Sequence, residues 1–306
     1  MSGDVEKRVN QLVSSIKNQR TALDAEAKRL RTPAFLSAFD KQNHDSWCLS
    51  VTGDCLVRLR LFTEQNFNFI ETMGIISVAR YIFELSVWLQ LFKLDSRYGI
   101  VYYAQLIETQ RRYWKDYRAQ VNREICLLKK FEEEEKVALH EAISQMGQLS
   151  NPEQQQRAAY TAPKAVADFI DKQAARHFSL YAEQAKVNGY GFQAHLVEKK
   201  VAPRIDKALA EIDTEKASFD AGVSKNVRDL IPKRWQWRQM AQKVGLVDEY
   251  DFIYTFSSKL LHATPASITT DQKNLELEEF AVFLKYIHVK IADILELSKA
   301  YPAKMA

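Results

Sequence analysis

The segment GIISVARYIFELSVWLQLF, residues 74–92, decides which kind of fold the chain adopts. It is nearly all apolar, and its length approaches that of a membrane span. Arg80 and Glu84 lie near its middle, where an ionised side chain in a bilayer costs roughly 2.5 to 3.5 kcal/mol. We therefore predict a helix buried in protein rather than a membrane span, and we expect no membrane partner.

The composition around this segment indicates long helices. The chain has 306 residues but only 9 Gly and 7 Pro, well below their usual shares of roughly 7% and 5%. Few turn-forming residues mean few turns, and the long stretches are rich in good helix formers such as Ala, Leu, Glu and Lys. The predicted fold class is all-α, a multi-helix bundle with a long protruding helical arm.

Helical periodicity and the positions of Pro and Gly predict where the helices lie. They are expected at residues 4–31, 46–71, 74–93, 97–146, 163–187, 203–219, 235–244, 247–262 and 271–300. The polar stretch 148–163 is interpreted as a linker because it holds two prolines. The expected organisation is an N-terminal helix in 1–40, a helical core from 41–130 with 226–306, and an inserted helical arm over 131–225.

Charge and cysteine content narrow the possible functions only slightly. The net charge of +4 permits contact with nucleic acid but does not require it. Three cysteines without CxxC spacing favour reduced thiols and neither a zinc site nor a disulfide framework. No phosphate-binding loop or dinucleotide fingerprint occurs, so we expect no metal and no cofactor. The opening residues lack the apolar run of a secretory signal, and we expect a cytoplasmic protein.

Arg80 and Glu84 are the first candidate site. Residues four apart stack on one face of a helix, so these two side chains can pair. Two interpretations stay open. The pair could order neighbouring groups in the core, although a buried ion pair contributes little net stability. Alternatively, the pair could serve a function.

The second candidate is YDFIYTFSSKLLHATPASI, residues 250–268. Asp251, Tyr254, Ser258 and His262 recur at the spacing of one helical face. A histidine has a pKa near neutrality, so beside hydroxyls and a carboxylate it suits proton transfer. The alternative is a histidine that caps the helix or packs in the core.

These two segments together resemble a known family. RYIFEL at 80–85, followed much later by Tyr-x-x-Ser-x-x-x-x-His-x-x-Pro at 254–265, is similar to a bacterial all-helical family of unknown function. That family is similar in outline to the HEPN helical bundles of toxins and phage-defence proteins. The resemblance covers about 74–94 and 235–268. The positions that match are Arg80, Glu84, Tyr254, Ser257, His262 and Pro265.

The resemblance implies a metal-independent ribonuclease. In this scheme His262 acts as general acid or base toward an RNA 2′-hydroxyl, and Arg80 stabilises the developing charge. Glu84 orients Arg80, while Tyr254 or Ser257 hydrogen-bonds the phosphate or the histidine. Many HEPN ribonucleases carry an Arg, then four to six other residues, then a His. This sequence has no Arg there, so Arg80 would supply the cation from another helix.

Two basic and aromatic stretches bear on RNA as a partner. Residues 110–124 and 232–243 combine cations, which can neutralise phosphates, with rings that can stack on bases. The candidate nucleic-acid-binding residues are Arg111, Lys115, Arg118, Lys233, Arg234 and Arg238. The alternative is that the rings pack inward and the charges face water, as in ordinary amphipathic helices.

Two functions therefore remain open from the sequence. One is a HEPN-like RNA-cleaving or RNA-binding effector of bacterial defence or stress response. The other is a non-catalytic helical module that oligomerises or binds a partner protein through the arm.

Overall fold

The computed structural model describes residues 2–67, 71–261 and 274–301, and within these ranges the chain forms helices and no strand. The all-α prediction is confirmed. The chain divides into two compact units. Unit 1 comprises residues 1–105 and 222–306, and unit 2 comprises residues 106–221.

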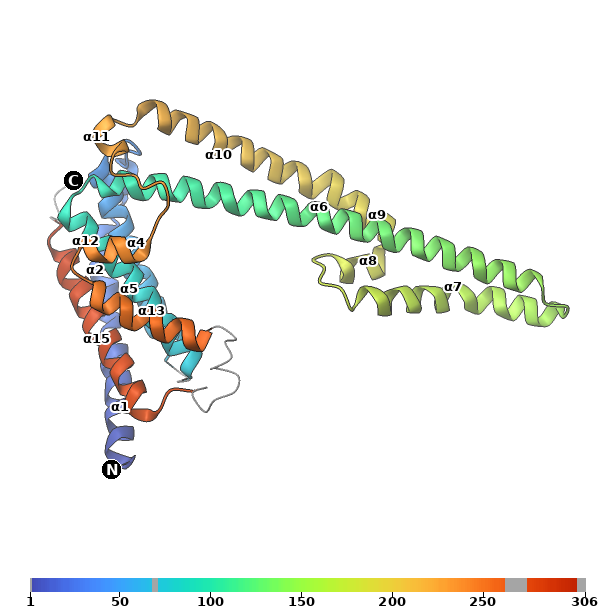
Figure 1. Ribbon diagram of the computed structural model, residues 1–306, viewed down its shortest axis with the longest axis horizontal. Coiled ribbons are helices and arrows are strands. Elements are labelled where there is room, and N and C mark those ends of the chain that lie inside the picture. The colour runs from blue at the N-terminus through green and yellow to red at the C-terminus, as the bar shows by residue number, and fades with distance from the viewer. Residues whose placement is uncertain (1, 68–70, 262–273, 302–306) are drawn as a thin grey trace. The chain divides into compact units, whose positions relative to one another are not determined.

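Unit 1 is built around one helix, α5. Its elements are α1 (Ser2–Asn18), α2 (Arg20–Leu30), α3 (Pro33–Ser37), α4 (His44–Gln65), α5 (Thr72–Leu94), the first turns of α6 (Tyr98–Gly147), α11 (Lys225–Arg228), α12 (Trp237–Lys243), α13 (Val247–Leu261) and α15 (Leu277–Lys299). Helices α4, α12, α13 and α15 all pack against α5. Helix α2 covers α4, and α1 lies along α15 (Figure 1).

The apolar segment that decides the fold is α5. Its residues Ile76, Ile82 and Phe83 are completely buried, which is the expected fate of apolar side chains in a central helix. By length and composition α5 could also cross a membrane, with a mean hydropathy of 1.4, and 61% of its most apolar window is buried inside the protein. One such helix is weak evidence for a membrane span.

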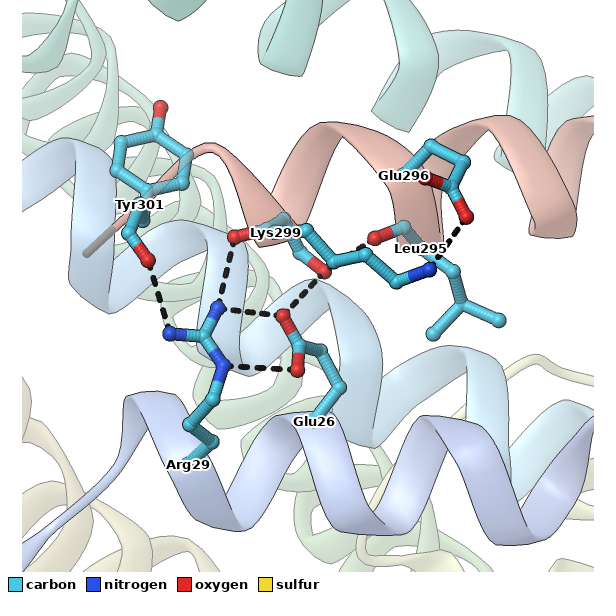
Figure 2. Close-up of polar contacts among 7 residues, drawn as sticks. Glu26, Arg29, Leu295, Glu296, Lys299 and Tyr301 are labelled. Carbon is cyan, nitrogen blue, oxygen red and sulfur yellow. Dashed lines mark hydrogen bonds and ion pairs between the residues drawn. The ribbon is translucent and has the colours of Figure 1, made fainter. Parts of the chain in front are cut away.

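Polar contacts tie the outer helices of unit 1 together. Figure 2 shows the guanidinium of Arg29, on α2, between the carboxylate of Glu26 and the backbone of Tyr301. Arg29 donates two hydrogen bonds to Glu26, and it donates one each to the carbonyls of Ser298 and Tyr301, at 2.9 and 2.8 Å. A cation at these carbonyls is favourable because a helix C-terminus carries partial negative charge. The contact therefore fixes α2 to the end of α15.

Unit 2 consists of long helices around a small core. Besides residues 106–147 of α6, it contains α7 (Pro152–Ala174), α8 (Ala182–Asn188), α9 (Tyr190–Leu196), a π-helical turn η1 (Val197–Val201) and α10 (Ala202–Gly222). Helix α6 has 50 residues and is about 75 Å long at 1.5 Å per residue. Its buried residues Val121, Leu128 and Phe131 pack with Ile170 of α7 and Ile205 of α10.

The predicted linker at 148–163 is wrong, because α7 begins at Pro152. The side chain of Asn151 accepts the backbone N–H of Glu153, and Pro152 occupies the first helical position. Both are strong helix-starting features. Pro163 lies inside α7 and does not break it.

Other helix limits also differ from the prediction. The expected first helix breaks at Gln19, between α1 and α2, and the expected helix 163–187 ends at Ala174. Gly189, with φ of 85°, separates α8 from α9. The unit boundary falls near residue 106, whereas the expected arm begins at 131, because the core of unit 2 includes Val121 and Leu128.

Candidate functional site

Over residues 72–89, one face of α5 stays open while the rest of the helix is buried. Its exposed and half-buried residues recur every three or four positions, which places them on a single face. This face, called the open strip below, contains Met73, Ser77, Arg80, Tyr81, Glu84, Leu85 and Trp88. Arg80 and Glu84 therefore belong to the surface that α5 opens to solvent between residues 72 and 89.

The two charges of the open strip form a partly exposed ion pair. Arg80 Nε donates to Glu84 Oε1 at 3.2 Å, and the two side chains remain 33% and 26% exposed. Partial burial works against the charged guanidinium, but the hydrogen bond to Glu84 and the neighbouring phenol outweigh it, so the pKa of Arg80 is raised. Because water reaches both groups, the pair is not a sealed core contact.

Tyr254 of α13 completes the cluster. Its hydroxyl donates to Glu84 Oε1 at 2.5 Å, and its ring lies 4.3 Å from Arg80 Cζ, in the geometry of a cation–π contact. Burial, followed by the hydrogen bond to Glu84, raises the pKa of Tyr254 above that of a free tyrosine. The phenol therefore stays protonated at neutral pH and acts as a donor rather than a base.

Aromatic packing fixes the position of Tyr254. Tyr250, one turn earlier on α13, stacks on it with ring centroids 4.2 Å apart. Phe83 of α5 contacts both rings edge-on or tilted. The sequence analysis did not identify Tyr250, although its spacing of four residues from Tyr254 places it on the same face.

A second polar network holds α13 against α15. Glu249 accepts hydrogen bonds from Tyr286 at 3.0 Å and from Lys290 at 2.8 Å, and the Lys290 side chain is only 13% exposed. Burial raises the pKa of Tyr286, so it too remains a donor. Sequence reasoning missed this network because its members are 37 and 41 positions apart along the chain.

The other predicted residues of α13 lie in different surroundings. Ser257 is fully buried, and its hydroxyl donates to the Tyr254 carbonyl at 3.2 Å. Asp251 is exposed and pairs with Arg238 at 3.1 Å. Ser258 is exposed. The structure therefore brings together Arg80, Glu84 and Tyr254, whereas His262 and Pro265 lie outside the described residues.

The predicted nucleic-acid-binding cations divide into two groups. Arg111 and Arg118 pair with Asp213 and Asp206 of α10, at 2.5 and 2.7 Å, and Arg238 pairs with Asp251 as described above. These three cations are partly neutralised within the protein. Lys115, Lys233 and Arg234 are exposed.

The tryptophans of the second basic stretch pack inward. Trp235 stacks on Trp88 with centroids 4.1 Å apart and an interplanar angle of 15°. Trp237 contacts both rings edge-on. These rings therefore stabilise the junction of α5 and α12, and they are not free platforms for bases.

Among the residues that the structure describes, no group of three or more His, Cys, Asp or Glu side chains gathers as metal ligands would. Comparison with known proteins assigns no family: no family model, curated protein or solved structure matches the chain.

Proposed function

We propose that the protein is a HEPN-like effector that binds and cleaves RNA at the open strip of α5. The observation that carries the proposal is the partly exposed guanidinium of Arg80 on the open strip of the central helix α5. A partly buried charge is costly unless it is paired; Glu84 accepts a hydrogen bond from its Nε, and Tyr254 lies against one face. A phosphate oxygen is the natural further partner for an arginine.

The three placed residues have distinct roles in this proposal. Arg80 binds the phosphodiester and stabilises charge that develops on it. Glu84 fixes the guanidinium through Nε, which leaves the terminal nitrogens directed away from Glu84. Tyr254 holds Glu84 and covers one face of the guanidinium. Ser257 has a packing role, because its hydroxyl is used within α13.

The catalytic part of the proposal depends on His262, whose role comes from the resemblance. It acts as the general acid or base that moves the proton of the RNA 2′-hydroxyl. The test compares purified wild-type and His262→Ala protein on a labelled single-stranded RNA, with His195→Ala as the control because His195 is an exposed histidine of unit 2. The proposal expects cleavage by wild type and His195→Ala, and none by His262→Ala. Equal cleavage by all three, or none by any, would overturn it.

A second function has one observation in its favour. Several large apolar side chains of unit 2 are strongly exposed, including Tyr160 at 88%, Val187 at 87% and Phe178 at 79%. Large exposed apolar side chains are where a partner protein could bind. A non-catalytic module that binds a partner protein through unit 2 would explain them, and it predicts no RNA cleavage by the wild-type protein.

A further inference from the structure

Unit 2 ends in a helical hairpin that has no core of its own. Residues 132–147 of α6 and 152–169 of α7 run side by side in opposite directions (Figure 1). The structure describes all of residues 132–169, and none of them is buried. Most helices in proteins gain their stability by burying an apolar face. In this hairpin Val137 and Ile143 remain 57% and 52% exposed, so the outward face of α6 has uncovered apolar surface.

That outward face is a continuous stripe with coiled-coil spacing. From Arg112 to Ser144, exposed residues of α6 recur alternately after four and three positions. The stripe consists of Arg112, Asp116, Ala119, Arg123, Cys126, Lys130, Glu133, Val137, His140 and Ser144. An average spacing of 3.5 residues keeps one face of a helix directed at a second long helix. The stripe therefore has the shape to receive another extended helix.

The charges along α6 indicate which helix that is. On the stripe itself, the N-terminal part carries Arg112, Arg123 and Lys130 beside one acid, Asp116, and the C-terminal part carries Glu133. A parallel second α6 in register would set Arg123 against Arg123 and Glu133 against Glu133, whereas an antiparallel one can set Arg123 against Glu133. Such a pair has two-fold symmetry, the commonest symmetry of protein dimers.

We propose that two copies of the chain associate through this stripe as an antiparallel pair of α6 helices. When residue 128 of one copy lies level with residue 128 of the other, each stripe residue faces a stripe residue of the second copy. Arg123 then faces Glu133 of the second copy, and Ala119 faces Val137 of the second copy. Tyr113, which is 59% exposed, lies beside Ile143 of the second copy.

The two symmetry-related Arg123–Glu133 pairs are the ionic part of this interface, so its strength depends on salt. Exposed ion pairs are weak individually and are screened at high ionic strength. The dimer is therefore expected to be concentration-dependent and to dissociate as salt is raised. The proposal does not depend on the RNA site, and none of its tests uses RNA.

Disulfide cross-linking tests the orientation and the register together. The variant Ala119→Cys with Val137→Cys is made in a Cys126→Ser background, which removes the one exposed native thiol; Cys48 and Cys55 are buried. On one helix the new thiols are about 27 Å apart, too far for a disulfide within one chain. We expect mild oxidation to give a covalent dimer of the double variant, while each single variant stays monomeric. No dimer from the double variant, or equal cross-linking by Ala119→Cys alone, would contradict the proposal.

Charge reversal tests the ionic pairing without new cysteines. Arg123→Glu or Glu133→Arg alone makes both symmetry-related pairs repulsive, and each should raise the dimer dissociation constant about tenfold in analytical ultracentrifugation. The double reversal restores opposite charges and should return the constant to the wild-type value. Both positions are exposed, and circular dichroism checks that each variant folds. Wild-type protein that stays monomeric at every concentration, or a double variant no better than the singles, would overturn the proposal.

Discussion

Tyr254 makes two contacts of different physical kinds at the open strip, and one substitution separates them. Tyr254→Phe keeps the ring over Arg80 but removes the hydrogen bond to the Glu84 carboxylate. We expect it to lower the free energy of unfolding by about 1 kcal/mol, a modest value because the cluster is partly exposed. Urea denaturation measures the change, with Tyr160→Phe as the control because Tyr160 is almost fully exposed. Equal effects of the two variants would show that the hydrogen bond contributes nothing.

The contact between Glu26 and Arg29 should make a contribution to stability that depends on pH. The hydrogen bond of Glu26 with Arg29 is the main cause that lowers the pKa of the Glu26 carboxyl below the ordinary 4.5. A carboxyl with a lowered pKa stabilises the fold fully above its unfolded pKa, and this contribution is lost as the pH falls further. Glu26→Gln should cost about 2 kcal/mol at pH 7, because it leaves Arg29 without its carboxylate partner. The difference between wild type and variant should shrink below pH 4. A difference that stays constant with pH would contradict this account of Glu26.

Single residues show what the sequence could and could not predict about the site. The pairing of Arg80 with Glu84 follows from their spacing of four in a helix, and the structure has it. Tyr254 followed from the helical-face spacing of residues 250–268 and from the resemblance, but its hydrogen bond to Glu84 depends on how α13 packs on α5. No local pattern contains that information, because the two residues are 170 positions apart. The contact of Glu249 with Lys290 could not be predicted for the same reason, because these residues are 41 positions apart.

At the level of elements, the scarcity of Gly and Pro predicted the helical class correctly, whereas individual prolines were misleading. Pro163 suggested a linker, yet it lies inside α7. A proline within a long helix removes one hydrogen bond, and a strong start at Asn151 and Pro152 can offset that loss. The open strip of α5 could not be located from the sequence, because a nearly uniform apolar run does not show which face of a helix is exposed.

The cost of Pro163 leads to a prediction for α7. Pro163→Ala restores the missing backbone donor in an exposed helix interior, so it should stabilise the hairpin by about 2 kcal/mol. Hydrogen exchange at residues 155–170 should slow in the variant. Lys164→Ala, a neighbouring exposed position, is the control and should change exchange little. Unchanged or faster exchange in Pro163→Ala would contradict this prediction.

At the scale of the whole molecule, the sequence predicted a core assembled from distant segments but not the place where the units divide. The boundary near residue 106 falls within the unbroken helix α6. A continuous helix carries no Gly, Pro or change of periodicity at such a point. Only the contacts made by residues such as Val121 and Leu128, which pack with α7 and α10, define the second unit.

The three cysteines report on the packing of the whole chain. Cys48 and Cys55 are buried in α4, and burial raises the pKa of each thiol to about 12, whereas Cys126 is exposed. The thiolate is the reactive form. We therefore expect one thiol to react rapidly with a disulfide reagent at pH 8 in native protein, and three to react in urea. Rapid reaction of two or three thiols in native protein would contradict the packing of α4 against α2 and α5.

The central claim is that Arg80 on the open strip binds RNA, and fluorescence anisotropy with a labelled single-stranded RNA tests it most directly. Arg97→Ala is the matched control, because Arg97 is also in unit 1 and is also paired with a carboxylate, Asp95, but lies outside the open strip. We predict that Arg80→Ala weakens binding about tenfold or more, as expected for losing a charged hydrogen bond, and that Arg97→Ala leaves it unchanged. Equal affinity of wild type, Arg80→Ala and Arg97→Ala for the RNA would contradict the claim.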